Sequence, residues 1–401
     1  MRRAFTVILL LLCVLPVSAR RQPRYPFVRT ELNVLQKPGG DAREFDYFCR
    51  KLDTLLLTGR GDVRVLYVGG SHVQGGTLSD RLRRRFLSLR YGIEGGRGLV
   101  FPFSAAGTNT PVSYSSSFSG NWERATLLKP GDEDLGLSGM AVMAADTSAR
   151  VAIDLLPRDR QLLQQRYTFN KVDVLGDGTL EPVLLLGRDT LRGIGDRGIR
   201  HFDLPHYADW IQLGFVGQGR YSLRGLYLDK PGGGFSLSEA GVNGASTHAW
   251  LRCERWEQEL HRVMPDLVIF SIGINDIQGD DFDVRRFKAN YRELVRRVRR
   301  VNPRCAILFT GINDSWRKRQ VNPHTDAAEE AFRELAREQD CIFWDWYQVM
   351  GGSGSMALWE QAGLAQADKI HFTPAGYKLV GDLLFEAITS SRGRFVVAPF
   401  Q

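Results

Sequence analysis

The apolar positions of this chain follow two different periods. Phe45, Phe48, Leu52 and Leu55 recur at the spacing of one helix face, which predicts a helix over about residues 41–57. Short runs of β-branched and aromatic residues predict strands. Before residue 108 and from residue 236 onward, these runs alternate with helical patterns, as in a parallel sheet covered by helices on both faces. The strands predicted in these two regions are 65–68, 267–272, 306–310 and 342–346.

The segment from about Thr108 to Lys230 has a different pattern. Short alternating runs recur there without helical patterns between them, separated by Asp-Gly, Gly-Gln-Gly and Pro-Gly-Gly turn signals. A structureless loop of about 120 residues would be too long for a compact domain. We therefore expect a β-sandwich of the jelly-roll type, inserted into an α/β domain. Its predicted strands are 151–155, 166–174, 182–186, 210–216 and 221–228.

The first 19 residues have the pattern of a secretory signal peptide. Arg2 and Arg3 precede an apolar stretch over Val7–Leu15, and Val17-Ser18-Ala19 is a small-residue cleavage site. The apolar stretch is shorter than the ~20 residues that a spanning helix needs, so we expect export to the periplasm or the exterior without stable membrane insertion. The predicted organisation is a signal peptide at 1–19, an extended leader at 20–40, an α/β domain in two parts at 41–107 and 231–401, and a β insert at 108–230.

The charge of the chain and its motif content restrict the classes of partner and cofactor that we expect. The formal net charge of the 401-residue chain is +8, and two of its positive charges are the arginines of the signal peptide. A basic exported protein suits anionic envelope polymers better than nucleic acid. The dense arginines of Arg285–Arg304 alternate with an apolar stripe at helical spacing, which predicts the solvated face of an amphipathic helix. With seven histidines and no CxxC or HExxH motif, we expect no metal and no cofactor.

Four cysteines remain after the signal peptide, and they allow three full pairings. Cys305 and Cys341 each begin a predicted strand, so both could lie at the same edge of the sheet. The sequence does not choose among the pairings of Cys49, Cys253, Cys305 and Cys341, and a disulfide between Cys305 and Cys341 is the one we expect from the strand positions.

A candidate nucleophile follows the first strand of the α/β domain. The run Val65–Val68 ends in Gly69-Gly70, and Ser71 comes next, before a helical pattern over about 78–89. Ser71 then lies at the carboxyl end of a parallel strand, the edge of such a sheet where ligands bind. A serine hydroxyl becomes a good nucleophile only when a base takes its proton.

The base and its partner occur near the carboxyl terminus. Asp368 and His371 are three residues apart, so one loop can place the carboxylate against the imidazole and fix its tautomer. Two strands end in the same tetrapeptide, Gly-Ile-Asn-Asp, which puts Asn275 or Asn313 at the carboxyl edge as an amide donor for an oxyanion. Gly244, before another helical stretch, can offer an unobstructed backbone N–H.

In this order the four blocks resemble the SGNH (GDSL-like) hydrolase family, over 63–76 and about 236–388. The resemblance implies a three-layer αβα sandwich of the flavodoxin-like type around a parallel sheet. It further implies Ser71 as nucleophile, His371 as base and Asp368 as its orienting acid. The oxyanion hole would comprise the N–H groups of Ser71 and Gly244 and the side chain of Asn275, which is preferred to Asn313 because its strand directly follows the Gly244 helix.

One departure from the family pattern is that Gly70 stands where the family usually has aspartate. The pair Ser71-His72 and the β insert are similar to bacterial peptidoglycan O-acetylesterases, in which a module resembling carbohydrate-binding domains interrupts the hydrolase domain. The α/β-hydrolase alternative fits less well, because its serine lies in GxSxG and position 73 here is valine. We expect a secreted esterase acting on an acetylated polysaccharide; the alternatives are a non-catalytic glycan-binding protein and a lipase or thioesterase.

Overall fold

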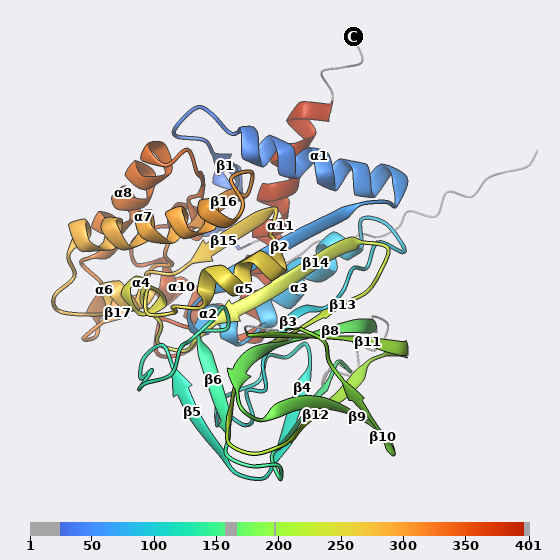
Figure 1. Cartoon of the computed structure of the whole chain (residues 1–401). Helices are drawn as coiled ribbons and strands as arrows, with labels where there is room; N and C mark the ends of the chain where they lie inside the picture. The colour runs from blue at the N-terminus through green and yellow to red at the C-terminus, as the bar shows by residue number, and fades with distance from the viewer. Residues whose placement is uncertain (1–24, 157–166, 196–197, 397–401) are drawn as a thin grey trace, which may run out of the picture.

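The computed structural model describes residues 25–156, 167–195 and 198–396, and the predicted signal peptide lies outside this range. Its parallel sheet has the strand order β1-β19-β16-β15-β2-β14 (Figure 1). All neighbouring pairs are parallel except β1 with β19. The strands span Leu35–Gln36 (β1), Asp62–Gly69 (β2), Gly234–Gly241 (β14), Leu267–Ser271 (β15), Ala306–Thr310 (β16) and Ile342–Trp344 (β19).

Helices lie on both sides of this sheet, as the alternation of periods predicted (Figure 1). One group packs α3 against α11, and the other packs α7 against α5 and α8. Buried apolar residues face the sheet; α7, for example, buries Phe287, Tyr291, Leu294 and Val298 and leaves most of its arginines outside. The longer helices are Arg43–Thr58 (α1), Thr77–Leu87 (α3), Trp256–Val263 (α5), Val284–Val301 (α7), Thr325–Glu338 (α8) and Pro374–Val396 (α11).

Short elements at the carboxyl edge of the sheet complete the α/β part. They are the helices Ser71–Gln74 (α2), Thr247–Trp250 (α4), Ile274–Ile277 (α6), Trp346–Val349 (α9) and Ser355–Gln361 (α10), and the hairpin Trp316–Arg317 (β17) with Gln320–Val321 (β18). Residues 25–40, expected as an extended leader, contain a 3₁₀ turn at Thr30–Leu32 and β1. Asn33 ties this segment down, because its amide donates to Leu383 and its oxygen accepts from the Trp344 indole.

The middle of the chain forms two antiparallel sheets, which are the green and cyan strands in the lower half of Figure 1. One sheet has the order β10-β9-β12-β7-β4, and the other has β11-β8-β13-β6-β5, with β3 paired to β13. The fold thus combines a mixed α/β part, built on the parallel sheet, with an all-β insert. The strands are Gly98–Val100 (β3), Ser115–Ser119 (β4), Trp122–Thr126 (β5), Met140–Ala144 (β6), Arg150–Asp154 (β7), Phe169–Gly178 (β8), Glu181–Leu186 (β9), Asp189–Arg192 (β10), Ile199–Ala208 (β11), Trp210–Val216 (β12) and Tyr221–Asp229 (β13).

The predicted disulfide between Cys305 and Cys341 is wrong. Both cysteines are buried free thiols. In the register between β16 and β19, Ile342 lies beside Leu308, so Cys341 lies beside Ile307 and is two residues out of step with Cys305. An offset of two residues is about 6.6 Å along the strand, and combined at right angles with the spacing of about 4.8 Å between strands it gives about 8 Å between Cα atoms, beyond the reach of a disulfide.

Candidate active site

Strand register brings three chain segments to one point at the carboxyl edge of the sheet. Gly69 at the end of β2 lies beside Gly241 of β14 on one side and beside Ser271 of β15 on the other. The chain continues from these residues into α2, into the loop before α4 and into α6. Ser71, Gly244 and Asn275 therefore follow three neighbouring strand ends; the sequence predicted this position for Ser71 and Asn275 but did not predict the strand before Gly244.

A chain of hydrogen bonds joins Ser71, His371 and Asp368. The distance from Ser71 Oγ to His371 Nε2 is 2.8 Å, and the distance from His371 Nδ1 to Asp368 Oδ2 is also 2.8 Å. When Nδ1 donates its proton to the carboxylate, Nε2 is the acceptor that faces the serine hydroxyl. This is the arrangement in which a serine becomes a nucleophile and the imidazolium that forms is stabilised.

The loop between Asp368 and His371 holds the carboxylate in its charged form. Burial raises the pKa of Asp368, but hydrogen bonds from the backbone and ring of His371 and from the Ile370 N–H outweigh it and leave the pKa below its usual value. Lys369 adopts a φ of 53°, a left-handed conformation that lets both Asp368 and His371 turn toward each other. The loop thus orients the base through its backbone as well as through the carboxylate.

Two backbone donors at the site are available to an oxyanion. The N–H groups of Ser71 and Gly244 have no protein acceptor within the residues that the structure describes. Gly244 has a φ of 79°, a conformation that residues with a Cβ rarely adopt. This turn explains a glycine at position 244, and the loop is exposed there.

The two Gly-Ile-Asn-Asp repeats have different surroundings. Asn275 donates one amide hydrogen to the Ala245 carbonyl at 2.9 Å, which leaves its second hydrogen for a ligand. Asn313 is buried and donates to the carbonyls of Asp314 at 2.9 Å and Ile370 at 3.0 Å. Both of its hydrogens are therefore used inside the protein, and the bond to Ile370 braces the loop that holds His371. Asn275 is the better placed of the two as an oxyanion donor.

The glycine that departs from the family pattern lies against this donor. A Cβ on Gly70 would stand 3.2 Å from Asn275 Nδ2 and 3.6 Å from the Ala245 carbonyl oxygen. A side chain at position 70 would press on the amide of Asn275 unless that amide moved. The glycine at position 70 therefore leaves room for the side chain of Asn275 where it lies.

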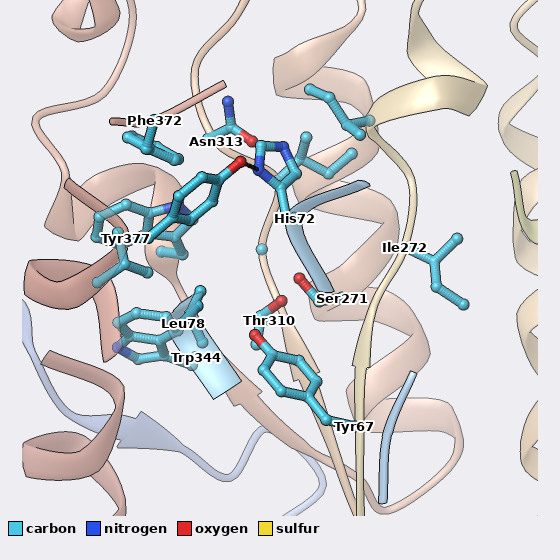
Figure 2. A pocket seen from close by; sticks show the side chains of 15 residues that line it. Tyr67, His72, Leu78, Ser271, Ile272, Thr310, Asn313, Trp344, Phe372 and Tyr377 are labelled. Atoms are coloured by element: carbon cyan, nitrogen blue, oxygen red, sulfur yellow. Dashed lines mark hydrogen bonds between the residues drawn. The ribbon is translucent and has the colours of Figure 1, made fainter. Parts of the chain in front are cut away.

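His72, next to the nucleophile, has a role that sequence reasoning missed. Its ring lies 5.3 Å from that of His371, and its Nδ1 is 2.9 Å from the hydroxyl of Tyr377 (Figure 2). Burial, together with a smaller effect of the neighbouring His371, lowers the pKa of His72 to about 3. His72 is thus a neutral ring at neutral pH, which adds no repulsion when His371 takes a proton.

Below these rings, Figure 2 shows a small cavity inside the sheet edge. Its volume is about 30 Å³, and its lining includes the hydroxyl groups of Tyr67, Ser271 and Thr310. This is room for one or two water molecules with polar partners, and it is too small for a substrate.

A larger groove adjoins Asn275 on the outside. Its volume is about 430 Å³, and most of its lining is polar. Asp276 at its floor accepts hydrogen bonds from the N–H and hydroxyl of Thr247, and burial raises the pKa of Asp276 to about 6. The lining residues include Ser246, His248, Asp276, Asp281, Arg286 and Asn290. Across the described ranges, no cluster of three His, Cys, Asp or Glu could hold a metal ion.

A parallel sheet with a serine, a histidine and an aspartate joined at its carboxyl edge is an arrangement that can support ester hydrolysis. Residues 216–379 match the model of the GDSL-like lipase/acylhydrolase family, so this part of the chain is a GDSL-like hydrolase domain. The matched region includes Gly244, Asn275, Asp368 and His371, while Ser71 lies outside it, on the other side of the β insert. No curated protein sequence is significantly similar to the chain.

One solved structure shares the fold over most of the chain. A peptidoglycan O-acetylesterase is similar with a TM-score of 0.74 and 23% identity, over 90% of this chain and 99% of that one. The likeness therefore includes the inserted β part. An acetylxylan esterase from Geobacillus stearothermophilus is 20% identical with a TM-score of 0.32, over 38% of this chain and 71% of that one. No helix among the described residues is long and apolar enough to span a bilayer.

Proposed function

We propose that this protein is an exported serine esterase that removes O-acetyl groups from a polysaccharide, with peptidoglycan as the first substrate to test. The observation that carries the proposal is the pair of 2.8 Å hydrogen bonds joining Ser71, His371 and Asp368. A glycan-binding protein that had lost catalysis would have no need for this alignment. The secretory pattern of residues 1–19 supports action in the periplasm or outside the cell.

The geometry supports a two-step acyl transfer. Ser71 Oγ attacks the acetyl carbonyl while its proton passes to His371 Nε2, and the oxyanion accepts hydrogen bonds from Ser71 N–H, Gly244 N–H and the Asn275 amide. His371 then gives the proton to the sugar oxygen, which leaves as an alcohol. Water attacks the acetyl-serine with His371 again as base, and acetate and free Ser71 result. The carboxylate of Asp368 stabilises the imidazolium in both steps.

The groove beside Asn275 supports a carbohydrate rather than a lipid. A long acyl chain needs an apolar channel, whereas this groove offers carboxylate, amide, hydroxyl and imidazole groups that suit sugar hydroxyls. Because Asn275 belongs to both the groove and the predicted oxyanion hole, a polymer lying in the groove can present an acetyl ester to Ser71. The peptidoglycan O-acetylesterase of similar fold motivates the choice of peptidoglycan.

The test compares acetate release by the purified mature protein from O-acetylated peptidoglycan, from acetylxylan and from aryl esters of increasing chain length. We expect hydrolysis of acetyl esters, with activity falling sharply for butyryl and octanoyl esters. Ser71→Ala and His371→Ala should each lower kcat by about 10⁴-fold or more. Ser88→Ala and His206→Ala, which change a serine and a histidine away from the site, are the matched controls and should leave kcat unchanged.

Three results would contradict the proposal. Undiminished hydrolysis by Ser71→Ala would remove the assigned nucleophile. A wild-type protein that binds glycans but neither hydrolyses acetyl esters nor reacts with a fluorophosphonate at Ser71 would be a binding protein. A preference for long-chain esters would favour a lipase or thioesterase.

A further inference from the structure

A buried amide lies one helical turn after the nucleophile. Gln74 is the last residue of α2 and has 1% of its surface exposed. Its Oε1 accepts a hydrogen bond of 2.6 Å from the backbone N–H of Asn243. Its Nε2 donates to Thr108 Oγ1 at 2.9 Å and to Asn109 Oδ1 at 3.0 Å. Both ends of the amide are therefore engaged, which fixes its orientation because a buried polar group without a partner is costly.

The acceptor side of Gln74 holds the residue that precedes Gly244. The same loop is fixed on its other side, where Asn275 donates to the Ala245 carbonyl and Asp276 accepts from Thr247. Gln74 is a side-chain contact that ties the loop to the helix of Ser71. The direction of the Gly244 N–H relative to Ser71 therefore depends on this side chain.

The donor side of Gln74 contacts the inserted β part. Asn109 lies in the connection between β3 and β4, and its Oδ1 also accepts from Asn243 Nδ2 at 2.8 Å. Gln74, Asn109 and Asn243 thus form a closed set of hydrogen bonds. It joins the helix α2 that begins at Ser71, the insert and the loop that holds Gly244. A second point of the insert comes near, since Leu128 Cδ1 lies 3.2 Å from where a Cβ on Gly244 would stand.

We propose that Gln74 is a positioning residue for the oxyanion hole, and that the insert completes the active site through Asn109. This inference rests on the proposed esterase function and deepens it. Donors of an oxyanion hole act by being held in place before charge develops, and misplacement by a fraction of an ångström costs rate. The insert then contributes to the chemical step itself, even on a substrate that carries no glycan.

The experiment uses the whole mature protein and a soluble aryl acetate, so that glycan binding cannot contribute. Gln74→Met keeps the length of the side chain but removes both hydrogen-bonding ends, and we expect kcat to fall 10- to 100-fold with KM changed less than twofold. Asn109→Ala removes one exposed side chain of the insert, and we expect kcat to fall 3- to 10-fold. The double variant should be no slower than Gln74→Met alone, because both changes break one network.

Thr110→Ala is the matched control. Thr110 neighbours Asn109 in the same loop, but its hydroxyl bonds to Ser116 within the insert, so kcat should be unchanged. The thermal midpoint is measured for each variant, and a structural role alone would lower that midpoint without changing kcat below it. If Gln74→Met does not fold, Asn109→Ala at the surface decides.

The failures of the two proposals are distinguishable. A wild-type kcat for Asn109→Ala, in a wild-type protein that hydrolyses the ester through Ser71, overturns this inference alone. Independent, multiplicative effects of the two substitutions would also overturn it. A wild-type protein without esterase activity overturns the proposed function, and this inference with it.

Discussion

At the scale of single residues, identical tetrapeptides have different tasks. Asn275 keeps one amide hydrogen available at the site, whereas Asn313 uses both hydrogens inside the protein. The difference arises from the loops around them: the Gly244 loop approaches Asn275 from one side only, while the Asp368–His371 loop closes over Asn313. Position along the sheet edge, and not residue type, decides which amide faces a substrate.

This difference predicts opposite phenotypes for one substitution. Asn275→Ala should lower kcat by about 100- to 1000-fold, as the loss of an oxyanion donor does, with a small change in thermal midpoint. Asn313→Ala removes the donor to the carbonyls of buried Asp314 and partly buried Ile370 and should lower the free energy of unfolding by about 2–3 kcal/mol. Aryl acetate kinetics and urea unfolding of both variants check this, and equal kinetic losses in the two variants would contradict it.

The sequence predicted the meeting of Ser71, Asp368 and His371, because each residue type has a chemical task and a recognisable position at a strand end or in a DxxH spacing. The contacts of Gln74 and His72 were not predicted. An amide or a histidine in a short helix has no pattern of its own, and the importance of each comes from partners such as Asn109, Asn243 and Tyr377 that are distant in sequence.

At the scale of elements, one central feature was missed. β14 lies beside β2 and leads to the Gly244 loop, but the sequence reading did not assign it as a strand. Its glycines, its serines and Glu239 obscure the apolar signal of a buried strand. Glu239 is tolerated there because Arg83 and Arg97 lie within 2.8 Å and 3.2 Å of its carboxylate oxygens. Partners from other elements, invisible in a local window, make the strand possible.

The contact between α6 and α4 gives a prediction about pH. Burial raises the pKa of Asp276 to about 6 from 3.8, so the native state holds this proton more tightly than the unfolded chain does. Stability from this group is therefore greatest below about pH 4 and is lost as the pH rises to about 6. Asp276→Asn cannot titrate, so the free energy of unfolding of wild type relative to this variant should fall by about 2 kcal/mol between pH 4.5 and 7.

Urea unfolding at the two pH values measures this difference. Asp281→Asn is the matched control, since the side chain of Asp281 is 84% exposed in the same region. It should show little of the pH-dependent difference. A difference of the opposite sign for Asp276→Asn would show that hydrogen bonds from Thr247 outweigh burial and hold the carboxylate ionised.

At the scale of the whole molecule, the two parts of the chain share one core. Buried apolar residues of the α/β part and of the β insert form a single continuous cluster. The change of period near residue 108 indicated the insert, although β3, before that position, already pairs with β13. The sequence could show that an insert exists, because its turn signals are local. It could not show how the insert contacts the hydrolase, because that depends on side chains far apart in the chain.

One buried ion pair crosses between the two parts. Glu259 of α5 accepts from Arg224 of β13 at 2.5 Å and from the Leu137 N–H at 2.6 Å, and both charged side chains are essentially buried. Asp177 of β8 is the second partner of Arg224, at 2.7 Å. Breaking a buried pair by removing one partner leaves an uncompensated charge, which costs far more than losing a surface pair.

Glu259→Ala should therefore lower the free energy of unfolding of the whole protein by about 3–5 kcal/mol. Glu257→Ala, on the same helix but in a surface pair with Arg300, should cost about 1 kcal/mol or less. The double variant Glu259→Leu with Arg224→Met removes both charges and should recover part of the loss. Because the two parts share a core, urea unfolding followed by tryptophan fluorescence and by circular dichroism should give one coincident transition for wild type. A Glu259→Ala protein no less stable than Glu257→Ala would show that the contact between insert and hydrolase depends on apolar packing instead.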